Sequence, residues 1–147
     1  MEESIMRHTL IKNDYCDGKY TVTIGTDMGQ FTGETFCRFE DRPHQSDYFG
    51  WELAEIKAEI EYARAKRKYY DAQMGALVQF WGEMSKTRTF DTDAFWVKKI
   101  AQRVDDLDNK RMFWSDRVRD LQENYRKNIV AFDEYCRKVE ARERKEV

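Results

Sequence analysis

Proline is nearly absent from this chain of 147 residues, and glycine is missing from its second half beyond position 82. The only proline is Pro43 and the last glycine is Gly82, so no later residue obliges a helix to end. The chain also lacks an apolar run long enough to cross a membrane and a basic-then-apolar signal segment. We therefore expect no membrane association and no secretory signal.

Cysteine and net charge are low as well. The three cysteines (Cys16, Cys37 and Cys136) lack the spacing of a disulfide framework, which predicts reduced thiols in a cytoplasmic protein. A net charge of −2 gives no bulk attraction to nucleic acid. Charged residues at 37% are typical of long solvated helices, and aromatics at 14% argue against disorder. The length predicts one domain, residues 1–147.

Two long helices are predicted, over residues 51–84 and 92–145. In both, apolar or aromatic residues recur at alternating steps of three and four, which is the spacing of a heptad seam. Polar residues interrupt the seam at Arg67, Arg111 and Asn128. The short hydroxyl-rich stretch between the helices predicts an antiparallel hairpin with its corner at residues 85–90.

Folding the chain about position 87 pairs the two seams along their length. Tyr70 then faces Val104, and Ala63, the smallest seam residue, faces the long Arg111. In this register the second helix extends about twenty residues past the first, and its seam there has no helix to cover it. An uncovered apolar stripe predicts a contact with the N-terminal region, a second copy or a target.

This C-terminal stripe is also the candidate surface for a homodimer, because a buried asparagine commonly sets the pairing of identical helices. Its residues are Tyr125, Asn128, Phe132, Tyr135 and Val139.

The N-terminal part, residues 7–40, predicts a three-stranded antiparallel meander. Asp17 and Gly18 form a two-residue hairpin signal, since both tolerate positive φ. Alternation places Tyr20, Val22 and Ile24 on one face, and a third strand places Phe31, Cys37 and Phe39 on one face.

Residues 41–50 are the expected linker, and Met6 could be a second start site. The predicted fold class is α+β, with the meander packed on a long antiparallel, coiled-coil-like helical hairpin. We expect the apolar face of the sheet to lie on the C-terminal stripe, on Tyr125, Phe132 and Tyr135.

Basic and aromatic residues gather around the two seam arginines. This candidate partner- or anion-binding set comprises Arg64, Lys66, Arg67, Lys68, Tyr70, Arg111 and Trp114. An arginine presents a planar fork of donors that suits phosphate or carboxylate, and aromatic rings can stack a base. Alternatively, the arginines pair with Asp71, Asp105 or Asp108 and only fix the register. The sequence leaves both interpretations open.

Metal binding and catalysis are not expected. The metal-ligand types near the sheet lack zinc-site spacing, which indicates buried thiols and a surface histidine; these residues are His8, His44, Cys16 and Cys37. Two acidic clusters are interpreted as solvated faces of the long helices, with no histidine and no nucleophile at useful spacing; they are Glu52/Glu55/Glu59 and Asp105/Asp106/Asp108. The glycines at 25 and 29 match no phosphate-binding loop. We therefore predict no metal, no cofactor and no enzymatic activity.

One segment resembles a known group of proteins. Phe31-Thr-Gly-Glu-Thr-Phe-Cys-Arg-Phe-Glu-Asp41, followed by Gly50-Trp-Glu-Leu-Ala54, is similar to a pattern in small accessory proteins of phages and mobile elements of Gram-positive bacteria. The pattern is a short hairpin with glycine, then cysteine and an acidic pair, leading into a helix. The resemblance implies binding to a host defence, either a nuclease such as a CRISPR nuclease or its nucleotide signal. It carries no functional residues over.

The function expected from the sequence is that of a non-enzymatic interaction protein. The preferred interpretation is a phage accessory factor that binds and inhibits a host defence protein in the host cytoplasm. Two alternatives stay open, namely a sponge that sequesters a phosphate-bearing nucleotide signal and a structural coiled-coil adaptor.

Overall fold

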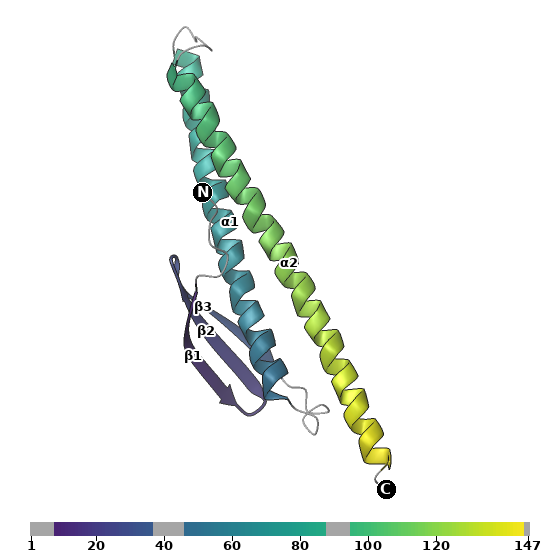
Figure 1. The fold of residues 1–147 in the computed structure, drawn as a ribbon. Coiled ribbons are helices and arrows are strands. Elements are labelled where there is room, and N and C mark those ends of the chain that lie inside the picture. The colour runs from purple at the N-terminus through teal and green to yellow at the C-terminus, as the bar shows by residue number, and fades with distance from the viewer. Residues whose placement is uncertain (1–7, 37–45, 88–94, 146–147) are drawn as a thin grey trace. The chain divides into compact units, whose positions relative to one another are not determined.

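The computed structural model describes residues 8–36, 46–87 and 95–145 (Figure 1). Three strands precede two long helices: β1 (Thr9–Cys16), β2 (Lys19–Thr26), β3 (Gly29–Phe36), α1 (Asp47–Thr87) and α2 (Phe95–Lys145). The predicted α+β class is confirmed, because the antiparallel sheet packs against two long helices that contact each other as a hairpin. Among the described residues, no helix combines the length and the apolar character that crossing a membrane requires.

The internal contacts divide the chain into two compact units. The sheet unit comprises Met1–Tyr62 and Arg119–Val147, and the helical unit comprises Ala63–Val118. Both helices therefore contribute residues to both units. The interpretation of residues 1–147 as one domain stays a prediction.

The sheet has the order β1-β2-β3 and the predicted hairpin turn. Asp17 and Gly18 both adopt positive φ, at 46° and 81°. β2 continues to Thr26, and Gly25 pairs with both neighbouring strands of the sheet. β1 lies at one edge, is exposed along its length and has a register irregularity between Leu10 and Lys12. Cys37, Phe39 and the linker up to position 45 lie outside the described residues.

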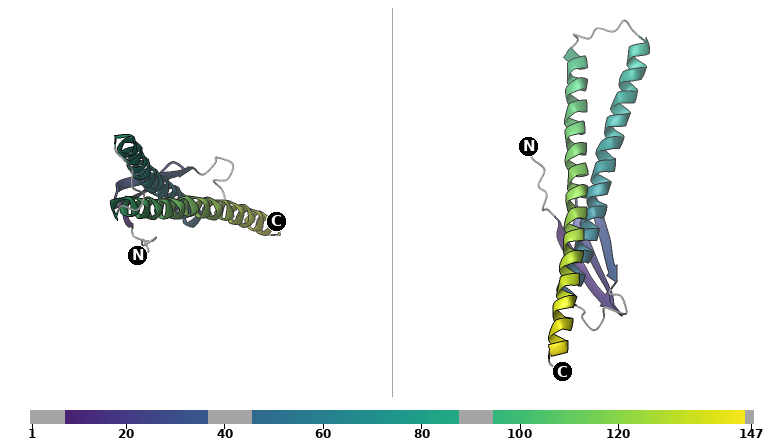
Figure 2. Two further views of the ribbon diagram at one scale, coloured as in Figure 1. Left: turned by 90° about the horizontal axis from the view of Figure 1, so that it is seen from above. Right: turned by 90° about the vertical axis from the view of Figure 1, so that its right-hand side faces the viewer.

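The apolar face of the sheet packs on α1. Tyr20, Val22 and Ile24 share one face as predicted, and all are at most 1% exposed. They form one buried cluster with Ala54 and Ala58 of α1. Figure 2 shows the sheet beside the N-terminal part of α1. The expectation that this face lies on Tyr125, Phe132 and Tyr135 of α2 is wrong.

Small residues on α1 allow the sheet to pack closely against this helix. Gly50, Ala54 and Ala58 recur every fourth residue and therefore share one helix face. A Cβ on Gly50 would meet the Tyr20 ring at 2.4 Å, and a Cβ on Gly33 of β3 would lie 2.0 Å from the Ala54 carbonyl oxygen. Gly33 is thus required for the close approach of the strand and helix backbones.

The helix bounds differ from the predicted ones. α1 begins at Asp47 rather than at 51 and reaches Thr87 rather than 84, so residues 85–87 of the expected corner are helical. Ser85 Oγ donates a hydrogen bond to the Gly82 carbonyl oxygen at 2.9 Å, so this hydroxyl bonds within the helix instead of breaking it. α2 is described from Phe95, and residues 88–94 lie outside the described chain.

The pairing of the helices within the helical unit is shifted from the prediction. The Tyr70 ring, expected opposite Val104, has Lys110 Nζ 5.4 Å from its centroid, six positions further along α2. Leu77, expected opposite Val97, shares a groove with Arg103 and Leu107. A shift close to one heptad places seam residues on seam residues again, so the periodicity could not distinguish the two registers.

Candidate functional site

Among the described residues of the helical unit, Lys66 is the buried charged one. Its side chain packs with two rings, the ammonium nitrogen lying 5.7 Å from the centroids of both Tyr70 and Trp114. These are cation–π contacts, in which the electron-rich faces of the rings attract the charge. Lys66, Tyr70 and Trp114 are 6%, 6% and 2% exposed. They therefore build the interior of the hairpin and cannot serve as a partner-binding surface, which corrects that prediction for all three.

Arg67, one of the three predicted polar members of the seam, follows Lys66 in the sequence and is half-buried. Steps of three and of four from Ala63 lead to Lys66 and Arg67 respectively, and both are permitted in a heptad seam. In the structure the buried residue is Lys66, which the step of three reaches. Arg64 and Lys68 of the same basic run are exposed.

Arg111 is paired along its own helix. Its Nη2 and Nε donate to Asp108 Oδ1 at 2.6 and 3.2 Å. The pKa of Arg111 is raised by this hydrogen bond and by the Asp108 charge, with a further contribution from the charge of Asp71; burial opposes the shift. The guanidinium is therefore charged at any physiological pH. It is paired with Asp108, as the alternative to anion binding predicted.

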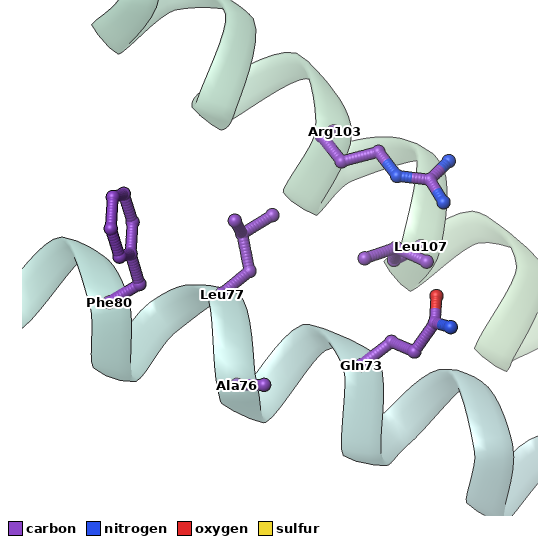
Figure 3. Close-up of a pocket in the computed structure, with 6 residues that line it drawn as sticks. All are labelled: Gln73, Ala76, Leu77, Phe80, Arg103 and Leu107. Carbon is purple, nitrogen blue, oxygen red and sulfur yellow. The ribbon is translucent and has the colours of Figure 1, made fainter.

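An open groove lies between α1 and α2 within the helical unit (Figure 3). Its cavity volume is about 340 Å³, and it is lined by Gln73, Ala76, Leu77, Phe80, Arg103 and Leu107. Leu77 and Leu107 reach into it from opposite helices, and the Arg103 guanidinium and the Gln73 amide lie on one side. Phe80 remains 47% exposed although it lines the groove.

Sequence reasoning missed this groove because Gln73, Ala76, Phe80 and Arg103 lie off the predicted seam. A Cβ added to Gly75 or to Gly82 would meet nothing within 4 Å, so these two positions of α1 face open space.

The charge of the chain is unevenly distributed between the units. The helical unit contains twelve lysines and arginines against eight aspartates and glutamates, whereas the remainder contains fourteen against twenty. The net charges are therefore +4 and −6, which the overall value of −2 conceals. The net positive charge of the helical unit favours a partner with an acidic surface.

The C-terminal stripe is partly covered by the chain's own first helix. Phe49 lies 5.5 Å from Phe132 and 5.9 Å from Tyr135 between ring centroids, and Lys57 Nζ lies 5.5 Å from the Tyr125 centroid. The early start of α1 supplies Phe49, so the expectation of a stripe without intrachain cover is wrong for these residues.

Two other members of the predicted dimer set need no second chain to be accommodated. The Asn128 amide donates to the backbone oxygen of Asn124 at 2.9 Å and to its side-chain oxygen at 3.1 Å, both on its own helix. Val139 is half-buried. Homodimerisation through this stripe stays a prediction.

The residues considered as metal ligands are distributed differently from the prediction. Cys16 is exposed rather than buried, and the side chain of His8 is only 12% exposed rather than a surface group. His8 Nε2 lies 3.1 Å from Glu55 Oε1 and 3.5 Å from Glu59 Oε1. These two glutamates are half-buried against the histidine, so their interpretation as a solvated face is wrong. Cys37 and His44 lie outside the described residues.

Comparison of the chain with family models, with curated proteins and with solved structures gave no match.

Proposed function

We propose that this protein is a non-enzymatic interaction protein that binds a protein partner through the groove of the helical unit. The observation that supports the proposal is the groove itself, in which the half-buried Leu77 and the 47% exposed Phe80 are available to an incoming apolar side chain. Leu107 also lines the groove but is buried. Interface energy concentrates in such apolar pockets, while charged residues at the rim select the partner. Arg103 and the net positive charge of the unit favour an acidic partner surface.

The proposed partner is a defence protein of a bacterial host, such as a CRISPR nuclease, bound in the host cytoplasm by a phage accessory factor. This finer proposal is supported by the resemblance in residues 31–41 and 50–54.

Inhibition of DNA cleavage by a purified RNA-guided nuclease tests the proposal. The wild-type chain should inhibit in proportion to its concentration. Phe80→Ala combined with Arg103→Ala should weaken inhibition at least about tenfold, as expected when a central aromatic anchor is lost.

Phe95→Ala is the matched control, because Phe95 is also an aromatic of the helical unit, is 74% exposed and does not line the groove. This variant should inhibit like the wild type. An inactive wild type would contradict the nuclease as partner, and an equal loss in Phe95→Ala would contradict the groove as the binding site.

A nucleotide sponge is the second candidate, supported by the net positive charge of the helical unit and by the exposed Arg64 and Lys68. Saturating cyclic dinucleotides would then raise the melting temperature, because a ligand that binds only the folded state stabilises it. Arg64→Ala with Lys68→Ala should abolish that shift. An unchanged melting temperature of the wild type would exclude the sponge and leave protein binding.

The predicted homodimer is tested by sedimentation equilibrium. A dimer has twice the 17.7 kDa mass of one chain. Ile129 is 37% exposed and lies on the helix face of Tyr125 and Phe132, so Ile129→Glu should return the chain to monomer mass. Val130→Glu is the control, since Val130 is 56% exposed on the opposite side of α2. A wild-type mass of one chain would contradict the dimer.

A further inference from the structure

We propose that His8, Glu55 and Glu59 form a binding site for one divalent transition-metal ion of the zinc class. His8 immediately precedes β1, while Glu55 and Glu59 lie one turn apart on α1, and all three belong to the sheet unit. This site does not depend on the proposed function, which concerns the helical unit.

The distances between the three side chains match those between ligands of a single ion. His8 Nε2 lies 3.1 Å from Glu55 Oε1 and 3.5 Å from Glu59 Oε1, and one ligand atom of each residue lies within 4.8 Å of the others. Zinc binds nitrogen and oxygen ligands at about 2.1 Å, which places neighbouring ligand atoms about 3.0–3.4 Å apart at octahedral or tetrahedral angles. Small rotations of the two glutamate side chains would therefore bring all three ligands into bonding distance.

The donor set suits a first-row divalent ion. An imidazole nitrogen and two carboxylates offer one borderline and two hard ligands, a combination found at zinc sites. Their positions four residues apart on one helix give Glu55 and Glu59 the same arrangement as the paired histidines of helical zinc motifs. Three protein ligands leave a coordination position for water or for a group from a partner.

Partial burial makes a cation favourable here. The side chains of His8 and Glu59 are 12% and 17% exposed, and that of Glu55 is 37% exposed. Two carboxylates held close to one nitrogen repel each other, and solvent screens this repulsion less than at a fully exposed site. A divalent cation would offset this repulsion while binding all three groups.

A bound ion is expected to attach the beginning of β1 to α1. This strand is exposed along its length, and its pairing with β2 is irregular near Leu10. An ion shared by His8 and α1 would fix the beginning of the strand to the helix. Zn²⁺ should therefore raise the melting temperature of the full chain.

Calorimetric titration of the full chain with Zn²⁺ tests the proposal. A Cys16→Ser background removes the exposed thiol, which could bind zinc independently. One ion per chain should bind, and Glu55→Gln or Glu59→Gln should each lower the affinity at least about tenfold, since the neutral amide is a poor ligand. Glu52→Gln is the matched control, because Glu52 lies on the same helix and outside the cluster, and it should bind like the background chain.

Circular dichroism identifies any variant that does not fold, and Glu55→Gln changes the most exposed of the three ligands, so at least one informative variant is expected to stay folded. A melting temperature that rises with Zn²⁺ in the background chain and not in folded Glu55→Gln would support the site. If the background chain binds no Zn²⁺, or if both glutamine variants bind as tightly as Glu52→Gln, the proposal is overturned. The cluster is then a set of side-chain contacts between His8 and the two glutamates without a metal.

Discussion

Gly33→Ala should lower the free energy of unfolding by about 3 kcal/mol or more, because it places a methyl group inside the contact between β3 and α1. The new Cβ would lie 2.0 Å from the Ala54 carbonyl oxygen and 2.5 Å from the Ala58 nitrogen. Both are backbone atoms of a continuous helix, so neither can move aside as a flexible side chain would. The sheet must separate from the helix, and Tyr20, Val22 and Ile24 lose part of their cover.

Urea denaturation followed by circular dichroism measures the effect. The matched control is Gly75→Ala in α1, where a Cβ meets nothing within 4 Å. That substitution should stabilise the protein by about 0.5–1 kcal/mol, since alanine has the higher helix propensity. Equal stabilities of Gly33→Ala and the wild type would contradict the close approach of strand and helix.

Trp114→Ala should have the second large effect, with a loss of about 3–5 kcal/mol, as expected for removal of a buried tryptophan. Trp114 is 2% exposed, lies 5.3 Å from Phe113 between ring centroids, and is one of the two rings beside Lys66. The substitution therefore leaves a cavity and also removes one of the groups that stabilise a buried ammonium.

Trp96→Ala is the control for this prediction. Trp96 is 42% exposed and contacts Trp81 at a centroid distance of 6.3 Å, so its loss should cost about 1 kcal/mol. Thermal or urea unfolding of both variants gives the comparison. Similar losses in the two variants would contradict the assignment of Trp114 to the interior of the helical unit.

The elements that depend on local pattern could be predicted from the sequence. The period of two in residues 20–24 identified the buried face of β2, and the steps of three and four identified two long helices. The Asp17-Gly18 turn followed from residues that tolerate positive φ. These signals act over a few neighbouring residues, so a single sequence contains them.

The pairing of distant elements could not be predicted in the same way. A heptad pattern is unchanged by a shift of one heptad, so the contacts of Tyr70 on α2 required coordinates. The sheet packs on α1, and the small residues that permit this contact, Gly50, Ala54 and Ala58, do not belong to the heptad seam.

The candidate sites were harder still to anticipate. Lys66 and Arg67 are neighbours in the sequence, and only packing shows which one is buried. His8 and Glu55 are 47 positions apart, so no short motif links them. Arg103 and Phe80 reach one groove from different helices, and the sequence contains no pattern that joins them.

The irregularity between Leu10 and Lys12 has a consequence for how this molecule behaves at high concentration. An exposed edge strand normally offers a ladder of backbone donors and acceptors to which a strand of another molecule can add, the first step toward fibrils. The irregularity interrupts that ladder within β1, and the Lys12 ammonium would have to lose its hydration as another strand approached. We therefore expect this edge to resist the addition of a strand from another molecule, although β1 is exposed from end to end.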